Sequence, residues 1–155
     1  MTPQEQLEFN QFGCIARWLI ELAELKGHPM TDDASCNQFQ ALFLTPGQYG
    51  LLQISQIGNV IQNLNVGLSP NFQIYRRYCA IDYQFNHEHR DILVLSEIDV
   101  NDNATGFVNH CSLLREMNHQ HFRIRIPWND GSASERDFGV ASWEAKACHG
   151  VVLLP

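Results

Sequence analysis

The sequence predicts an α+β fold in which N-terminal helices pack on a C-terminal antiparallel sheet. In the first half, apolar residues recur at steps of three and four, which is the period of an amphipathic helix. In the second half, short apolar and aromatic runs lie between turn-forming residues, and one run alternates strictly between apolar and polar. Helices that come first and strands that follow are typical of α+β proteins.

Three helices are expected in the first half. The clearest covers residues 14–26, CIARWLIELAELK, and is followed by the stop signal Gly27. A second is expected from Thr31, whose hydroxyl can cap it, to just before Pro46, and a third over about 48–64. The helix expected over 14–26 places five apolar residues on one stripe: Ile15, Trp18, Leu19, Leu22 and Leu25.

The second half is expected to form strands. Residues 75–85, YRRYCAIDYQF, are rich in aromatic and β-favouring residues, and 91–99, DILVLSEID, contain a buried-strand pattern. Residues 110–117 and 121–128 read as a hairpin with a short loop, because Phe122, Ile124 and Ile126 alternate with polar residues or proline. A short segment surrounds Trp143, and the nearly apolar run 150–155 is the last expected strand.

Composition limits the possible functions. The 155 residues, 45% of them hydrophobic and 17% charged, predict a single domain over 1–155 with a packed core rather than disorder. Ten Lys and Arg against 17 Asp and Glu give a net charge of −7, so general nucleic-acid binding is not expected. No apolar run is long enough to span a membrane, and the acidic, polar N-terminus is not a secretory signal. The expected location is cytoplasmic, or exported without a cleavable signal peptide.

The five cysteines form an odd set without a C-x-x-C pair, which predicts thiols in a reducing compartment. Four of them are expected to be small core residues: Cys36, Cys79, Cys111 and Cys148. Cys14 differs because it follows Gly13 and begins the first predicted helix. The N-terminus of a helix carries unpaired N–H groups and partial positive charge, which stabilise a thiolate.

A reactive thiolate needs an acid–base partner, and histidine is the usual one. His110 opens the first arm of the predicted hairpin. Asn129 and Asp130 follow its second arm and could hold the imidazole in one tautomer. A helix-start Cys, a strand-start His and a later Asn or Asp therefore form a candidate catalytic set.

This order resembles that of papain-like cysteine peptidases. The layout is similar to that of the compact bacterial domains that trim double-glycine leader peptides. Two segments carry the resemblance: QFGCIARWLIELAELKG (11–27) and NHCSLLREMNHQHFRIRIPWNDG (109–131). The resemblance implies hydrolysis or acyl transfer at a peptide or side-chain amide bond of a peptide or protein substrate, through an acyl-enzyme and without a cofactor. Cys14 would be the nucleophile, His110 the base, and Asn129 or Asp130 the orienting residue.

The oxyanion donors are the least regular part of the pattern. We expect the backbone N–H of Cys14 to act together with Gln6 or Gln11. The resembled families usually place a Gln about six residues before the nucleophile, where this chain has Glu8. They also often place Asp where this chain has Ile126, before the proline that ends the second arm. Both departures favour the alternative of a non-catalytic module that binds a peptide or protein. In the hydrolase, loops 65–74 and 99–109 would line the cleft that sets its specificity.

Two further interpretations stay open. His121 is a rival base, with Asp137 sixteen residues later as its partner. A His-rich metal protein is the other, because residues two apart on a strand share a face and can bind one ion. Its possible ligands, which are more typical of solvated loops, are His87 with His89, His119 with His121, and Cys148 with His149.

Overall fold

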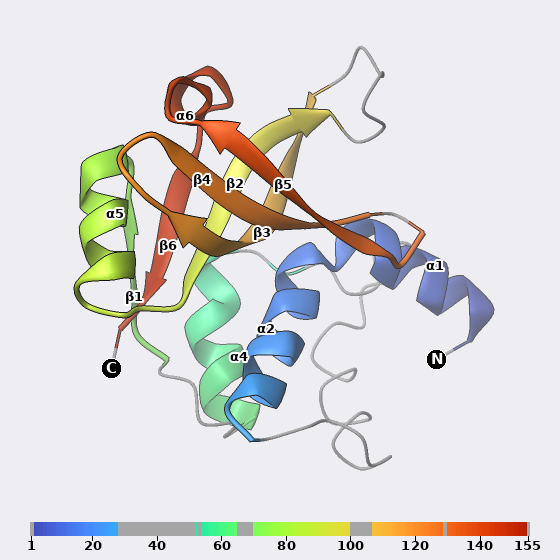
Figure 1. The fold of residues 1–155 in the computed structure, drawn as a ribbon. Helices are drawn as coiled ribbons and strands as arrows, with labels where there is room; N and C mark the ends of the chain where they lie inside the picture. The colour runs from blue at the N-terminus through green and yellow to red at the C-terminus, as the bar shows by residue number, and fades with distance from the viewer. Residues whose placement is uncertain are drawn as a thin grey trace. The chain divides into compact units, whose positions relative to one another are not determined.

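The computed structural model describes residues 2–27, 52, 54–64, 70–99, 107–128 and 130–154. They form two compact units. The first holds the described residues up to Asn71 together with Asp130 and Gly131, and the second holds Phe72–Trp128 and Ser132–Leu154. The first unit is helical and the second contains a six-stranded antiparallel sheet, so the α+β prediction is confirmed (Figure 1). The helix predicted over 31–46 lies outside the described residues.

Helix α1 (Pro3–Phe12) leads directly into helix α2 (Cys14–Leu25). Thr2 caps α1, because its side chain accepts a hydrogen bond from the N–H of Glu5 at 3.1 Å and the Glu5 carboxylate accepts one from the N–H of Thr2. Gly13 separates the two helices. A Cβ atom at Gly13 would lie 2.5 Å from the carbonyl oxygen of Phe9, so only glycine fits where α2 begins.

The apolar stripe predicted for α2 is confirmed at four of its five positions. Ile15, Trp18, Leu19 and Leu22 are buried, whereas the side chain of Leu25 is 66% exposed because it lies in the last turn of the helix. The stop signal works as expected. Gly27 adopts a positive φ of 84°, which residues with a side chain rarely adopt.

Of the third predicted helix, the structure describes residues 52 and 54–64. A 3₁₀ turn, η1 (Ile54–Gln56), precedes helix α4 (Ile57–Leu64), which buries Ile57, Val60 and Ile61. Position 58 inside this helix requires glycine, because a Cβ there would lie 2.6 Å from the carbonyl oxygen of Pro70.

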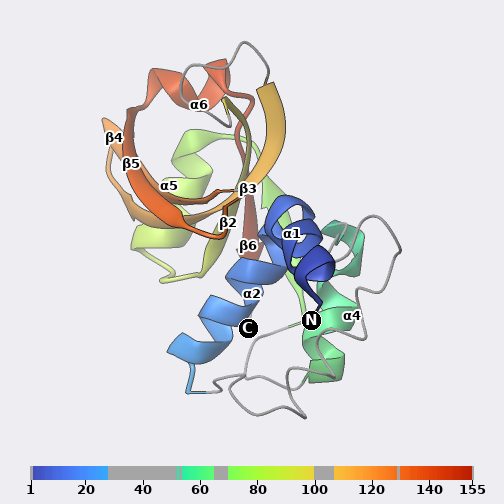
Figure 2. The same cartoon turned by 90° about the vertical axis from the view of Figure 1, so that its right-hand side faces the viewer.

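The sheet of the second unit has the order β1-β6-β2-β3-β4-β5, and each neighbouring pair is antiparallel. Figure 2 shows that this sheet is strongly curled. The predicted strands at 91–99, 110–117, 121–128 and 150–155 are confirmed, and Met117 pairs with Phe122 across the hairpin. The strands are β1 (Phe72–Tyr75), β2 (Ile92–Asp99), β3 (Phe107–Met117), β4 (His121–Pro127), β5 (Ala133–Gly139) and β6 (His149–Leu153).

The expectation of a strand over 75–85 is wrong. Most of that segment is helix α5 (Tyr78–Asn86), since Tyr78, Ile81 and Phe85 are spaced by three and four and pack on the core of the second unit. The sequence does not predict strands β1 and β5, because both lie at the edges of the sheet and neither contains a buried residue. The segment around Trp143 is a short helix, α6 (Ala141–Ala145).

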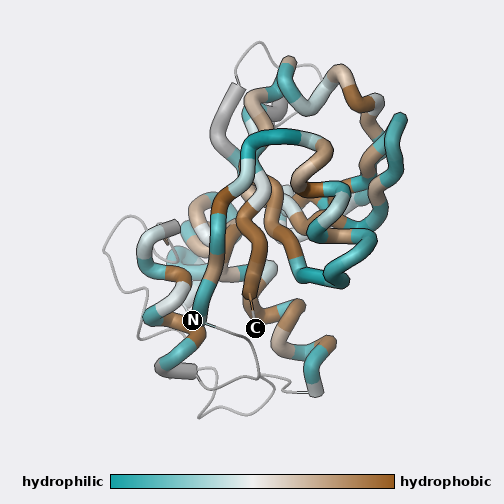
Figure 3. The backbone as a smooth tube through the Cα atoms, turned by 90° about the vertical axis from the view of Figure 1, so that its left-hand side faces the viewer, coloured by the Kyte–Doolittle hydropathy of each residue, from teal (hydrophilic) through white to brown (hydrophobic). Residues whose placement is uncertain are grey.

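One face of the sheet, together with α5 and α6, holds an apolar core. The central strands carry much of it, and the C-terminal strand is among the most hydrophobic parts of the chain in Figure 3. Gly150 of β6 lets α5 approach, because a Cβ there would collide with Cδ1 of Ile81. The buried members of the core are Ile81, Ile92, Val94, Leu114, Met117, Phe122, Ile124, Ile126, Trp143, Cys148 and Val152.

Candidate functional site

Cys14 is the first residue of α2, as the sequence predicts, and its side chain is partly buried. Gly13 caps the helix without a side chain, so the N-terminus of α2 has no side-chain hydrogen bond at its cap. In the same unit, the guanidinium of Arg17 donates to the carbonyl oxygen of Gly131 at 2.9 Å. The turn at Asp130 and Gly131 is thus attached to the helix that Cys14 begins.

The predicted orienting and oxyanion residues differ in their surroundings. Asp130 is exposed in a turn, and Asn129 lies outside the described residues. Gln6 and Gln11 are both exposed on α1, and the Gln6 amide donates to the side-chain oxygen of Asn10 at 2.8 Å. The roles of these four residues stay predictions.

His110 lies in β3 of the second unit and is 7% exposed. Its ring meets the ring of Trp128 edge-on, with 6.4 Å between centroids and 68° between planes. The indole N–H of Trp128 donates to the hydroxyl of Ser134 at 2.6 Å, and the Arg136 guanidinium lies 5.3 Å from the indole centroid. The imidazole therefore has an aromatic neighbour that is itself held in place.

His110 belongs to a buried polar row, which we define as Ser96, His110 and Ser112. Among the described residues, these are the polar side chains that are buried, and Ser96 and Ser112 are 2% and 0% exposed. Ser96 of β2 pairs directly with His110, and Ser112 is two residues further along β3 on the same face. Within the described part of the chain, neither serine hydroxyl has a hydrogen-bond partner. Burying such a hydroxyl costs about 1–3 kcal/mol, which makes this row a candidate for function rather than stability.

Ser96 is not among the predicted site residues, although the sequence contains a signal for it. In DILVLSEID the buried positions Ile92 and Val94 are followed at the same spacing by a serine, so a polar side chain points to a core face. Its partner on β3 could not be found without the register of the two strands.

The other cysteines mostly match the expectation of core residues. Cys111 and Cys148 are buried, and burial raises the pKa of Cys148 to about 12, an effect that Lys146 partly opposes. Cys79 is a correction, because it is exposed in the first turn of α5. Cys36 lies outside the described residues.

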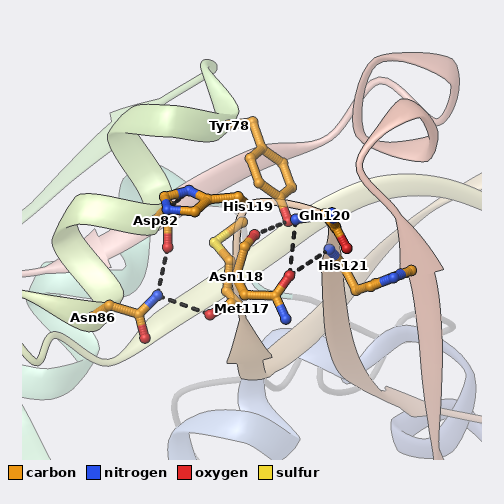
Figure 4. A network of polar contacts seen from close by, with 8 residues as sticks. All are labelled: Tyr78, Asp82, Asn86, Met117, Asn118, His119, Gln120 and His121. Carbon is orange, nitrogen blue, oxygen red and sulfur yellow. Dashed lines mark hydrogen bonds and ion pairs between the residues drawn. The ribbon is translucent and has the colours of Figure 1, made fainter.

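The turn of the β3–β4 hairpin carries a second polar cluster, on which α5 is anchored (Figure 4). The side-chain oxygen of Asn118 accepts hydrogen bonds from the N–H groups of Gln120 and His121, both at 2.8 Å. The hydroxyl of Tyr78 donates to the carbonyl oxygen of Asn118 at 2.7 Å, and the amide of Asn86 donates to that of Met117 at 2.8 Å. Burial, and then the charge of Asp82, raises the pKa of Tyr78 to about 12.

The rival base His121 is exposed at the start of β4. It borders an open pocket of about 280 Å³ that Asp137 also lines. The carboxylate of Asp137 is engaged by the Arg123 guanidinium at 2.9 Å, however, and His121 pairs in the sheet with Gly139. The carboxylate of Asp137 is thus paired with Arg123, whereas the expected partner was His121.

The histidine pairs do not gather metal ligands. His87 stacks on Tyr83 with 5.1 Å between ring centroids, and Nδ1 of His119 lies 3.3 Å from a carboxylate oxygen of Asp82. In the part of the chain that the structure describes, no three His, Cys, Asp or Glu side chains are grouped as a metal site would require. No helix among the described residues is long and apolar enough to cross a membrane.

Comparisons with protein-family models, curated proteins and solved structures give no match to this chain. The α+β layout, with N-terminal helices followed by a six-stranded antiparallel sheet, is what the structure shares with the family pattern described above. Any assignment of function therefore depends on the candidate residues themselves.

Proposed function

We propose that this protein is a papain-like cysteine hydrolase or acyltransferase that acts on a peptide or side-chain amide bond. The thiolate of Cys14 attacks the carbonyl carbon, and His110 accepts the thiol proton and then donates it to the departing amine. Water, or an acceptor amine, next attacks the thioester, gives up a proton to His110 and releases the thiol. Asn129 or Asp130 orients the imidazole, and the N–H of Cys14, with Gln6 or Gln11, receives the oxyanion.

The burial of His110 is the observation that carries this proposal. Histidine is not commonly buried among apolar residues, and here it lies beside two buried hydroxyls and an indole that is fixed by Ser134. A general base must be held in one orientation, and such surroundings hold a ring far better than solvent does.

The first unit supports the proposal independently. Cys14 begins a helix of twelve residues, so the partial positive charge of that helix favours the thiolate. Asp130 and Gly131 belong to the same compact unit as α2, and one residue separates Asp130 from Trp128, the ring neighbour of His110. Asp130, a candidate orienting residue, thus lies in the same compact unit as Cys14.

Selective alkylation tests the proposal. Iodoacetamide is added at about pH 6, where ordinary thiols are protonated, and labelling of each cysteine is followed by mass spectrometry. Cys79 is the matched control, because it also lies in the first turn of a helix and is more exposed. We expect Cys14 to react at least about tenfold faster than Cys79, and His110→Ala to remove the difference.

Equal labelling of Cys14 and Cys79 in the wild-type protein would contradict the hydrolase. That result would favour the non-catalytic alternative, a module that binds a peptide or protein. One contact already favours the alternative: the amide of Gln6 is engaged by Asn10 within α1 rather than left to an oxyanion.

A further inference from the structure

We propose that the pocket beside the turn of the β3–β4 hairpin binds a lysine or arginine side chain, or a small molecule that carries the same alkylammonium or alkylguanidinium group. All of its lining residues belong to the second unit, and its volume is about 280 Å³. Neither Cys14 nor His110 lines it. The inference therefore goes beyond the proposed hydrolase and does not depend on it.

Part of the pocket wall is apolar. Phe85 of α5, Met117 of β3 and Phe122 of β4 line it, and the last two are only 7% and 1% exposed. Such a surface suits the hydrocarbon stem that lysine and arginine carry below their charged group. The volume is just under the roughly 300–1,000 Å³ of pockets that hold drug-sized ligands. The pocket is thus of a size for one side chain.

The charged groups of the pocket give it a negative balance. The carboxylates of Glu116 and Asp137 and the guanidinium of Arg123 line it, which leaves an excess of one negative charge apart from His121. The side chains of Glu116 and Asp137 are 68% and 64% exposed, so an incoming ligand can reach both carboxylates. The chain as a whole carries a net charge of −7, which also attracts cations.

The contacts of Arg123 show how these carboxylates hold a cation. Its Nε and Nη2 lie 2.9 and 3.4 Å from the two oxygens of Asp137, so both oxygens of that carboxylate are engaged. Its Nη1 lies 3.4 Å from one oxygen of Glu116. A carboxylate has about four lone-pair sites, so Glu116 keeps acceptor capacity for a second cation. We therefore expect the ligand to bond mainly to Glu116, with Asp137 adding its charge.

The polar wall of the pocket is held in place by the hydrogen bonds of the turn (Figure 4). The side-chain oxygen of Asn118 accepts from the N–H groups of Gln120 and His121, both at 2.8 Å. The amide of Asn86 donates to the carbonyl oxygen of Met117, also at 2.8 Å. A site that is ordered before its ligand arrives avoids part of the entropic cost of binding.

Glu135 provides a matched control for Glu116. It lies two residues before Asp137 on β5, on the same face of the sheet, and it pairs with Arg115 at 3.2 Å. It does not line the pocket. Glu116→Gln and Glu135→Gln each remove one carboxylate that is paired with an arginine. An effect of net charge alone would therefore appear equally in both variants.

The experiment is an NMR titration of the ¹⁵N-labelled full-length chain with N-acetyl-lysine amide and N-acetyl-arginine amide. N-acetyl-norleucine amide is the uncharged probe with a similar stem. We expect both cationic probes to shift the Asn86 side-chain amide and the Gln120 N–H saturably, with Kd in the millimolar range, and the uncharged probe to leave them in place.

Three variants then test the charges, and circular dichroism verifies that each keeps its fold. Glu116→Gln should weaken binding of the cationic probes about threefold, and Glu135→Gln should leave it unchanged. Arg123→Gln removes the cation that already pairs with both carboxylates, so it should strengthen binding about threefold.

A blocked pentapeptide with one lysine among alanines distinguishes the two sources of the ligand. Binding at least as tight as that of the lysine amide would support a side chain of a peptide or protein. Binding of the single amide without the pentapeptide would support a free small molecule.

Four results would overturn the proposal. The first two are the absence of saturable shifts with either cationic probe, and equal shifts with the uncharged one. The third is equal weakening in Glu116→Gln and Glu135→Gln, which would reflect net charge alone. The fourth is weaker binding in Arg123→Gln, because a site for cations cannot depend on a resident guanidinium.

Discussion

Two polar clusters, one at the turn of the β3–β4 hairpin and the other between β2 and β3, differ in one respect that separates structure from candidate function. At the turn, the polar groups around Asn118 and Asn86 are largely exposed, and they bond to one another and to the backbone. Further from the turn, Ser96 of β2 and Ser112 of β3 are buried, and their hydroxyls have no hydrogen-bond partner among the described residues. Polar groups that are hydrogen-bonded at a turn can be explained by their contribution to stability. Buried polar groups without hydrogen-bond partners require another explanation.

The same comparison separates the two candidate bases. His121 lies at the anchored turn, where its backbone N–H bonds to Asn118 and its side chain is exposed. His110 is enclosed by β2, β3 and Trp128. An imidazole in solvent samples many orientations, and a buried one is restricted, so the second is better suited to proton transfer.

The largest effect is expected on stability, from a substitution in the aromatic cluster around Phe122, near the turn of the β3–β4 hairpin. Phe122 is 1% exposed, and its ring meets those of Tyr78, Phe138 and Trp143 at centroid distances of 5.3–6.0 Å. Phe122→Ala should lower the free energy of unfolding by about 3–5 kcal/mol, measured by urea denaturation. Phe138→Ala, at a partly buried position, should cost less. A change below about 1 kcal/mol at Phe122 would show that this cluster does not stabilise the turn.

The next effect tests the contrast between the two histidines. His110→Ala should lower the alkylation rate of Cys14 at about pH 6 by at least about tenfold if the imidazole sustains the thiolate, while His121→Ala should leave it unchanged. Circular dichroism verifies that both variants keep their fold. If His121→Ala lowered the alkylation rate and His110→Ala did not, the base would be His121 instead of His110.

The smallest effect concerns the hydroxyl of Tyr78, which connects α5 to the turn of the β3–β4 hairpin by a hydrogen bond. Tyr78→Phe removes the 2.7 Å bond to the carbonyl of Asn118 and should cost about 1 kcal/mol near neutral pH. The pKa of Tyr78 is raised from 10.0 to about 12, so the unfolded chain loses this proton first. The contribution of Tyr78 is therefore complete below pH 10 and is lost as the pH rises towards 12.

Urea denaturation at a series of pH values measures this loss as the difference between wild type and Tyr78→Phe. The difference cancels the parallel contribution of Cys148, whose pKa is also raised to about 12 and which both proteins share. The stability gap between the two proteins should narrow at alkaline pH. A constant gap would mean that folding does not raise the pKa of Tyr78.

The sequence predicts the parts of the fold whose periodicity is strong. The stripe of α2 and the alternation of Phe122, Ile124 and Ile126 in β4 each need one face buried, so the pattern is determined locally. Residues 75–85 were misjudged because their composition favours a strand, whereas the spacing of Tyr78, Ile81 and Phe85 favours the helix that forms. Composition is a weak guide where packing decides.

The candidate site was predictable only in part. The position of Cys14 at a helix start follows from local signals, and the placement of Cys111 on the face opposite His110 follows from strand alternation. Ser96 depends on the register between β2 and β3, which is a long-range property that no local pattern encodes. Whether Cys14 acts with His110 is what the alkylation experiments decide.

The bond from Arg17 to Gly131 also bears on how the protein is made. Its two ends are 114 positions apart, so the N-terminal helices leave the ribosome long before the turn that completes their unit exists. At a synthesis rate of about 5–20 residues per second, α1 and α2 wait several seconds for that partner. A nascent chain stopped before residue 130 therefore presents an incomplete helical unit.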